Sequence, residues 1–191
     1  MVVAPHVREA LTNGHPVIAL ESTIISHGMP YPRNLEVAKL VEDTVRAAGC
    51  VPATIAIIKG VPKIGINDAE MNMLALPQSS SSSSDIIWKA SRRDLGYICA
   101  MKYSASTTVA STMILAGAAN IPIFATGGIG GAHYDAQQTM DISADLMELG
   151  KTPVAVVSAG IKSILDLKLT MEVLETQGVP VVSSFNPYLL A

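Results

Sequence analysis

Hydrophobic residues recur along this chain in two spacings. Short, nearly continuous apolar runs predict buried strands over residues 16–20, 53–58, 61–66, 86–90, 121–125, 154–157 and 179–182. Stretches with apolar residues every three or four positions predict helices over residues 34–48, 68–76, 91–100, 107–119, 142–149 and 163–177. Because strands and helices alternate, the pattern predicts an α/β fold. We expect a mainly parallel sheet with helices on both faces, that is, an α/β/α sandwich.

Several local signals mark where these elements begin and end. Asn34 is a residue type that caps helices, and Gly49 follows the same helix as its predicted stop. Lys59 and Gly60 separate two apolar runs, which predicts a hairpin. Residues 79–84 are consecutive serines. Such low-complexity sequence cannot pack into a core, so we expect a mobile loop.

Composition narrows the class of protein. At 191 residues, 49% hydrophobic and 15% charged, the chain is expected to form a single domain, residues 1–191, with a large apolar interior. Its low charge also leads us to expect a homo-oligomer, because large interfaces are more apolar than ordinary surface. The net charge of −3 gives no electrostatic basis for binding a polyanion, so no nucleic acid partner is expected.

The sequence does not carry the features of a secreted or membrane protein. Residues 103–134 lack Asp, Glu, Lys and Arg, but Asn120, Pro122 and several glycines interrupt the span, so no membrane helix is expected. Cys50 and Cys99 form no redox or metal motif, and the first residues do not resemble a signal peptide. We therefore expect a cytoplasmic protein with reduced thiols.

Two residues at predicted strand ends could carry chemistry. Glu21 follows the run 16–20, and ligands of open α/β sheets bind at the carboxyl ends of strands. Partial burial would raise the pKa of its carboxyl and suit it to donate a proton, although a capping or surface carboxylate explains it about as well. Lys162 follows the run 154–157 and is predicted to begin a helix. The helix dipole and an apolar setting would lower its pKa and make it a nucleophile; a surface lysine is the alternative.

Other polar positions leave two interpretations open. The glycine-rich segment 127–131 could let backbone amides approach a phosphate, or could be only a tight turn. Asp141 and Asp145 flank Ser143. Asp141 suits a helix N-cap, and the aspartate pair could also hold a hard divalent cation partly through water. Lys89, with the arginines that follow it, suits either a phosphate or a solvated surface. The histidines show no zinc-ligand spacing.

Taken together, the motifs are similar to those of one family. The matching strings are ALESTIISHGMPYP (19–32), VPATIAII (51–58), SRRDL (91–95), TTVASTMILA (107–116), FATGGIGG ahead of His133, DISADL (141–146), AGIKSILDL and LETQGVP. In this order they resemble the pseudouridine-5′-phosphate glycosidase family, also called the indigoidine-synthase-A-like family. The resemblance extends from about residue 16 to residue 180.

The resemblance implies an enzyme, pseudouridylate synthase, that interconverts pseudouridine 5′-phosphate and water with uracil and D-ribose 5-phosphate. It implies that Glu21 donates a proton and that Lys162 is the nucleophile, which forms a Schiff base with the ring-opened sugar. It also implies Mn²⁺, one per subunit, at Asp141, and a homotrimer. The substrate contacts that it implies are Lys89, Val109, Ser143, Ala144 and Asp145.

The chain also departs from the family pattern. The serine run takes the place of a shorter connection, and Tyr134-Asp135 stand where the family usually has Arg-Gly. The family continues well beyond Ala191, through an asparagine-rich active-site segment, so we expect an incomplete version of the domain. The alternative hypothesis is a catalytically impaired phosphosugar-binding or assembly protein of the same fold. The long matching strings disfavour a third hypothesis, a different imine-forming lyase.

Overall fold

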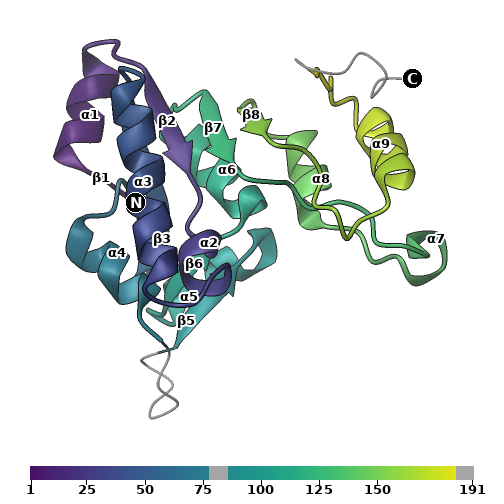
Figure 1. The fold of residues 1–191 in the computed structure, drawn as a ribbon, viewed down its shortest axis with the longest axis horizontal. Coiled ribbons are helices and arrows are strands. Elements are labelled where there is room, and N and C mark those ends of the chain that lie inside the picture. The colour runs from purple at the N-terminus through teal and green to yellow at the C-terminus, as the bar shows by residue number, and fades with distance from the viewer. Residues whose placement is uncertain (78–85, 184–191) are drawn as a thin grey trace.

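The computed structural model describes residues 1–77 and 86–183, and the predicted serine loop at 79–84 lies outside them. Within these residues, eight strands form one mostly parallel sheet (Figure 1). Its main path runs β1-β4-β3-β2-β7-β8, and β6 joins β3 and carries β5. The strands are β1 (Val2–Val3), β2 (Val17–Leu20), β3 (Val51–Ile58), β4 (Val61–Ile64), β5 (Ile87–Ala90), β6 (Ser104–Thr107), β7 (Ile123–Thr126) and β8 (Ala155–Ser158).

The long strand β3 organises the sheet. Its first half pairs in parallel with β2, and its second half pairs antiparallel with β4 and β6. The β3–β4 hairpin turns through Lys59 and Gly60, whose φ angles are 49° and 77°, so the predicted hairpin is confirmed. The pairs β2–β7 and β7–β8 are parallel. The carboxyl ends of β2, β7 and β8 therefore meet at one edge of the sheet.

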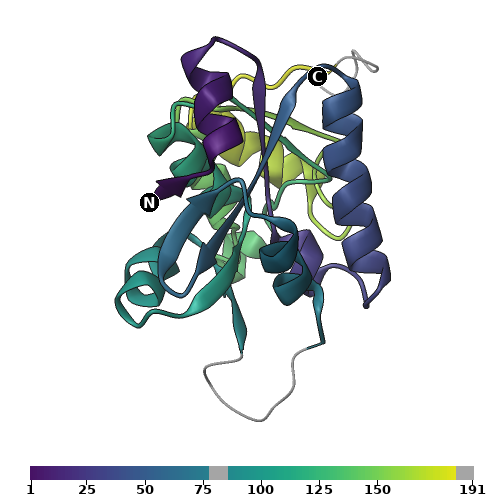
Figure 2. The ribbon, with the colours of Figure 1, turned by 90° about the vertical axis from the view of Figure 1, so that its left-hand side faces the viewer.

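Helices flank the sheet on both faces, as predicted; α1 and α3 lie on opposite sides of it (Figure 2). The helices are α1 (Pro5–Thr12), α2 (Thr23–His27), α3 (Arg33–Ala47), α4 (Asp68–Ala75), α5 (Leu95–Ala100), α6 (Val109–Ala118), α7 (Ala136–Thr139), α8 (Ala144–Leu149) and α9 (Leu167–Thr176), with a 3-10 turn η1 (Arg92–Asp94). On one face, α1 and α6 bury a core around Phe124, and on the other α2, α3 and α4 enclose Ile25 and Leu74. None of the helices in the described residues is long and apolar enough to cross a bilayer.

The helix α3 does not begin where the sequence predicted. The helix begins at Arg33, with Pro32 as its N-cap, so Asn34 lies inside the first turn. The Asn34 side chain is buried, and its amide donates to the carbonyls of Ile25 (2.6 Å) and Ala75 (2.8 Å). A buried amide needs such partners, and these two join α3 to the middle of α2 and to the end of α4.

Three other predicted elements differ from the structure. Residues 104–107 form β6, so the helix that was predicted from Thr107 begins at Val109 instead. The last helix begins at Leu167, because the Asp166 side chain accepts the Leu169 N–H (3.0 Å) and caps it there. Residues 179–182 are predicted as a strand but pair with no strand among the described residues, and Val182 is 87% exposed.

The sandwich is open on one side at β7 and β8. Phe124, which points towards α6, is fully buried, whereas the neighbouring Ile123 is 39% exposed on the opposite face. The register places Ala125 beside Val157, which is 60% exposed. In residues 1–77 and 86–183 no helix covers this second face, although parallel sheets are usually buried on both faces.

Candidate active site

Glu21 follows β2 directly, and its side chain meets Thr126 at the end of the neighbouring strand β7. The register pairs Leu20 with Ala125, so the next residue on each strand falls side by side. The Thr126 hydroxyl donates a hydrogen bond to Glu21 Oε1. Burial raises the pKa of the Glu21 carboxyl above its ordinary value of 4.5, while the Thr126 hydrogen bond and the charge of Lys162 oppose this rise. The predicted rise is confirmed, and it suits a proton donor.

Glu21 is also the point on which charges from distant parts of the chain converge. Lys162, Asp145 and Lys89 each act electrostatically on its pKa. These residues come from the loop after β8, from α8 and from β5, respectively. The fold thus brings four of the predicted site residues to one edge of the sheet.

Lys162 occupies a loop beside the end of β7 and does not begin a helix. Its backbone N–H donates to the Ile129 carbonyl (3.1 Å), and a bridge pairs Ile129 with Ile161. A Cβ on Gly128 would lie 3.4 Å from Lys162 Cγ, so the lysine stem passes directly over that glycine. The lysine is exposed. Both premises of the prediction, a helix start and an apolar setting, are wrong, and loop pairing fixes the position instead.

The glycine-rich turn after β7 is held by Asp145. Asp145 Oδ2 accepts the Gly130 N–H (2.9 Å), and Oδ1 accepts the Ala110 N–H at the start of α6 (2.9 Å). A Cβ on Gly130 would approach Asp145 Oδ2 and Ser143 Cβ to 2.7 Å, which real Cβ atoms do not do. Glycine is therefore required at residue 130 by the close approach of the Ser143 and Asp145 side chains, and no glycine in 127–131 has the positive φ of a glycine-requiring turn. Each Asp145 oxygen keeps a lone pair for a further donor.

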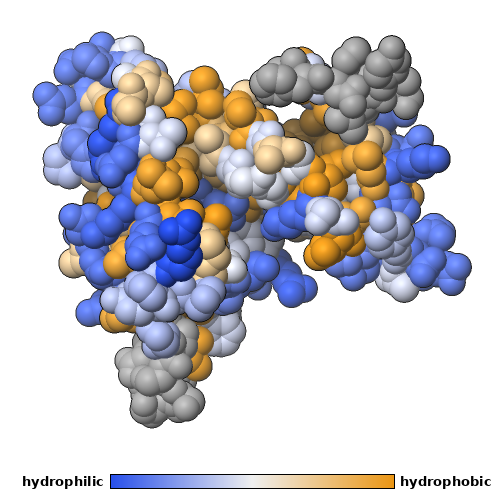
Figure 3. Space-filling view, in the orientation of Figure 1, coloured by the Kyte–Doolittle hydropathy of each residue, from blue (hydrophilic) through white to orange (hydrophobic). Residues whose placement is uncertain are grey.

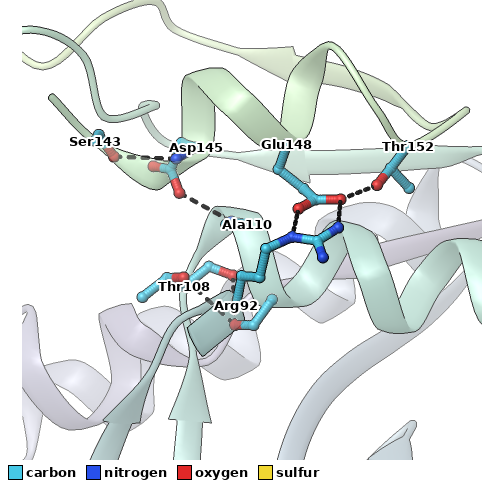
Figure 4. A network of polar contacts seen from close by, with 8 residues as sticks. Arg92, Thr108, Ala110, Ser143, Asp145, Glu148 and Thr152 are labelled. Carbon is cyan, nitrogen blue, oxygen red and sulfur yellow. Dashed lines mark hydrogen bonds and ion pairs between the residues drawn. The ribbon is translucent and has the colours of Figure 1, made fainter. Parts of the chain in front are cut away.

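Ser143, not Asp141, caps α8. The Ser143 hydroxyl accepts the Asp145 N–H (3.2 Å), as Figure 4 shows. The predicted N-cap at Asp141 is wrong, because the backbone enters the helix two residues later. Ser143 itself is partly buried, and Ala144, the first helical residue, is exposed.

An ion pair braces α8 against the start of the SRRDL segment. Arg92 contacts the buried Glu148 through Nε (2.5 Å) and Nη2 (3.0 Å), and the Thr152 hydroxyl donates to the same carboxylate (Figure 4). This bidentate contact fixes the orientation of the Arg92 guanidinium. The sequence suggested Arg92 as a phosphate ligand, but in the structure its guanidinium binds the Glu148 carboxylate instead.

Hydroxyl groups fix the neighbouring strand ends, and the sequence analysis did not single them out as a network. Ser22 and Thr107 both donate to the Ile55 carbonyl (2.7 Å each), and the Thr107 N–H donates to Ser22 Oγ (2.9 Å). All of these groups are buried. They hold Ser22, the residue after Glu21, against the end of β6, two residues before α6 begins at the buried Val109.

Lys89 reaches the site from β5, beside His27. Its side chain is exposed. Burial lowers the pKa of His27, and the nearby Lys89 charge lowers it further. His27 Nδ1 also lies 2.7 Å from Ser26 Oγ and 3.3 Å from Ser106 Oγ. The lowered pKa of His27 disfavours a second positive charge beside Lys89.

Asp141 lies apart on an exposed loop. Its carbonyl accepts the His133 N–H (3.0 Å), and its carboxylate is 4.0 Å from His133 Nδ1. Within the described ranges no group of three or more His, Cys, Asp or Glu side chains could enclose a metal ion. The residues around Asp141 therefore fit only a hard cation that keeps most of its ligands as water, with the exposed Asp141 carboxylate as the protein ligand.

Comparisons with known proteins agree on one family. The model of the family described as "Indigoidine synthase A like protein" matches residues 6–188. The chain is 60% identical over 179 residues to the pseudouridine-5′-phosphate glycosidase of Alkaliphilus metalliredigens, covering 94% of this chain and 56% of the relative. It is 57% identical to a pseudouridine-metabolizing bifunctional protein of Schizosaccharomyces pombe, covering 98% of this chain and 24% of that protein.

A solved structure is also similar. The prealnumycin C-glycosynthase AlnA, in complex with ribulose 5-phosphate, superposes with a TM-score of 0.82 at 43% identity, covering 94% of this chain and 56% of AlnA. The chain thus spans about half the length of the bacterial relatives that it matches. Because the family match extends over nearly all of its residues, the chain belongs to the family of indigoidine synthase A like proteins.

Proposed function

We propose that this chain carries the catalytic residues of a pseudouridine-5′-phosphate glycosidase, which converts pseudouridine 5′-phosphate and water into uracil and D-ribose 5-phosphate. The observation that carries the proposal is the meeting of Glu21, whose pKa is raised by burial, with the charge of Lys162 at the carboxyl ends of β2 and β8. The names of the curated relatives support the reaction class. Protonation of a heteroatom leaving group cannot cleave a C–C glycosidic bond, so a nucleophile is needed as well.

The first step opens the ribose ring. The Glu21 carboxyl gives its proton to the ring oxygen O4′ as the C1′–O4′ bond breaks, and the Lys162 amine forms a bond to C1′. Thr126 holds the Glu21 carboxyl in place through its hydroxyl. The loop pairing at Ile129 holds the lysine backbone on the same edge of the sheet.

The second step releases uracil. The secondary ammonium formed at Lys162 gives a proton to the Glu21 carboxylate, which restores the acid. The freed nitrogen lone pair then forms a C=N bond to C1′ as the C1′–C5 bond breaks, and uracil takes up a proton from water at C5. Water then adds to the imine carbon and releases ribose 5-phosphate, which restores the amine. This sequence balances atoms and charge without an oxidant or reductant.

The remaining site residues suit the phosphosugar. Lys89 is an exposed cation, and the Val109 N–H lies in the first turn of α6, where the helix dipole favours an anion. Ser143, Ala144 and Asp145 would contact the sugar from the start of α8. Mn²⁺, if present, would be held at Asp141 with water as its other ligands, and would supply positive charge near the phosphosugar.

A second candidate is a phosphosugar-binding or assembly protein that does not turn over. One observation favours it: Lys162 is exposed. The structural neighbour bound to ribulose 5-phosphate is consistent with phosphosugar binding in either case.

One experiment separates the two candidates. Purified chain is incubated with pseudouridine 5′-phosphate, with and without manganese, while uracil release is followed by chromatography. In parallel, borohydride is added with ribose 5-phosphate to reduce any imine. The enzyme proposal expects uracil release and a stable adduct on the peptide that contains Lys162. Lys162→Ala and Lys162→Arg should both lose the adduct, because a guanidinium stays protonated. Ribose 5-phosphate binding without either signal would favour the second candidate.

A further inference from the structure

Three short contacts bind the segment that follows Glu21 to the end of β6. The Thr23 hydroxyl donates to the Thr107 carbonyl (2.7 Å), and the Thr107 N–H donates to Ser22 Oγ (2.9 Å). Ser22 Oγ also lies 3.3 Å from Thr107 Oγ1. Ser22 and Thr107 are fully buried, and Thr23 is partly buried. We call these three residues the hydroxyl clamp.

The hydroxyl clamp is itself fixed to the core of the sheet. The Ser22 and Thr107 hydroxyls both donate to the Ile55 carbonyl in the middle of β3. The Thr112 hydroxyl donates to Thr107 Oγ1 (2.9 Å). Among the described residues, no buried side-chain nitrogen or oxygen lacks a hydrogen-bond partner. Because a fully satisfied buried network is rigid, the clamp holds the two segments in one arrangement.

The hydroxyl clamp lies between the two ends of the candidate active site. Glu21 is one residue from it and Val109 is two, so the Cα path to each is at most about 3.8 Å and about 7.6 Å, respectively. Lys89 is also close to it, because the β5–β6 register pairs Lys89 with Ser106, the residue before Thr107. The clamp therefore fixes the acid relative to both proposed phosphate contacts.

The phosphosugar requires a fixed spacing between these groups. In ribose 5-phosphate the ring oxygen and the phosphate are joined through C4′ and C5′, so a bound phosphate limits where the ring oxygen can lie. Proton transfer from Glu21 needs that oxygen within hydrogen-bond reach. A displacement of about 1 Å between reacting groups can lower a rate by about 10²-fold. The protein must therefore hold the acid at one distance from the phosphate contacts.

We propose that the hydroxyl clamp sets the distance between Glu21 and the phosphate contacts. Thr23 is then a positioning residue that determines how strongly the site prefers a 5-phosphorylated sugar. Its hydroxyl acts through the backbone of Thr107. This role rests on the proposed function, which assigns the acid to Glu21 and the phosphate contacts to Lys89 and Val109.

Thr23 can be changed without altering the exposed apolar face of the sheet. Hydrophobic residues gather over β7 and β8 in Figure 3, whereas the clamp joins the residue after Glu21 and the first residue of α2 to β6. Thr23 is also the only member of the clamp that is not fully buried. An effect of its substitution on ligand binding can therefore be assigned to the clamp.

A matched pair of variants at Thr23 tests the proposal. Thr23→Val keeps the shape of the side chain and removes the hydroxyl, whereas Thr23→Ser keeps the hydroxyl and removes the methyl group. Calorimetry measures the Kd of each purified chain for ribose 5-phosphate and for inorganic phosphate. We expect Thr23→Val to bind ribose 5-phosphate about tenfold more weakly, because one hydrogen bond that orders the site is lost. Its affinity for inorganic phosphate should be unchanged, because phosphate alone does not span the site. Thr23→Ser should stay within about twofold of wild type for both ligands.

Uracil release gives an independent readout. With pseudouridine 5′-phosphate as the substrate, kcat should fall by about 10²-fold in Thr23→Val and recover in Thr23→Ser. If wild type binds ribose 5-phosphate but releases no uracil, the proposed reaction fails, and the two affinities still decide whether the clamp positions the ligand. Urea unfolding checks that each variant is folded, and Thr23→Ala, which removes the same hydroxyl, replaces Thr23→Val if the latter does not fold.

Several results would overturn the proposal. One is an unchanged affinity of Thr23→Val for ribose 5-phosphate. Another is an equal loss of affinity for ribose 5-phosphate and for inorganic phosphate, or the same loss in Thr23→Ser as in Thr23→Val, because a merely structural role would give either result. The last is a wild type that binds ribose 5-phosphate no more tightly than inorganic phosphate.

Discussion

Replacing Gly130 with alanine tests whether the contact between the glycine-rich turn and α8 holds this end of the fold together. The added Cβ would lie 2.7 Å from both Asp145 Oδ2 and Ser143 Cβ, closer than real Cβ contacts. Asp145 is buried, and the Gly130 N–H donates to its carboxylate at 2.9 Å. The methyl group can be accommodated only if the turn and α8 separate.

The magnitude follows from the two interactions that separation disturbs. Overpacking a tight site costs about 1–3 kcal/mol, and a hydrogen bond to a charged group contributes roughly 1.5–3 kcal/mol. Because the carboxylate keeps its other bond, to the Ala110 N–H, we expect Gly130→Ala to lower the free energy of unfolding by about 3 kcal/mol. Urea unfolding followed by circular dichroism measures this loss.

Gly127→Ala is the matched control for this experiment. Gly127 lies in the same turn, but a Cβ there meets nothing within 4 Å, and its φ lies outside the left-handed region. Its unfolding free energy should stay within about 0.5 kcal/mol of wild type. Adding Ser143→Gly to Gly130→Ala removes one of the two clashing groups, and a double-mutant cycle should show a favourable coupling of about 1 kcal/mol. Equal urea midpoints for Gly130→Ala and wild type would refute the reasoning.

Three further predictions concern Glu21, Asp141 and the self-association of the chain. Because burial raises the pKa of Glu21 above 4.5, its contribution to stability is complete below that pH and is lost as pH rises through the raised pKa. Glu21→Gln should therefore gain stability relative to wild type between about pH 4 and about pH 8, and equal differences in urea midpoint at both pH values would contradict this. Asp141→Asn should weaken manganese binding in calorimetry without changing the unfolding midpoint; unchanged affinity would leave Asp141 with no metal role. Light scattering should return an oligomer, a trimer on the family resemblance, and a monomer mass at micromolar concentrations would reject it.

The sequence alone predicted most of the central strands and helices, because local patterning governs which segments form each element; it did not predict β1, β6, α1, α2 or α7, and its strand at 179–182 is absent. The apolar run before Glu21 is β2, and the pair Lys59 and Gly60 forms the hairpin turn that their position predicts. The raised pKa of Glu21 was one of two interpretations that its place after a strand allowed; the packing of β7 beside it decided between them. The strand and the hairpin turn need only neighbours close in the sequence.

Only the tertiary structure decided which partner each polar side chain takes. Asn34 looks like a helix cap, but it joins α3 to carbonyls 9 and 41 residues away. Asp145 looks like a first-turn carboxylate, yet it binds the amides of Ala110 and Gly130, 35 and 15 residues away. The same residue type satisfies either set of donors, so sequence spacing cannot choose between them.

The position of Lys162 and the exposure of one face of β7 and β8 also could not be predicted from sequence spacing. The sequence places Lys162 after a strand, but the capping of α9 at Asp166 and the pairing of Ile161 with Ile129 decide that it lies in an open loop. The apolar pattern of β7 and β8 predicts burial, and in the described residues only the face towards α6 is buried. Periodicity reveals that a side chain can be buried, whereas the packing of distant elements decides whether it is.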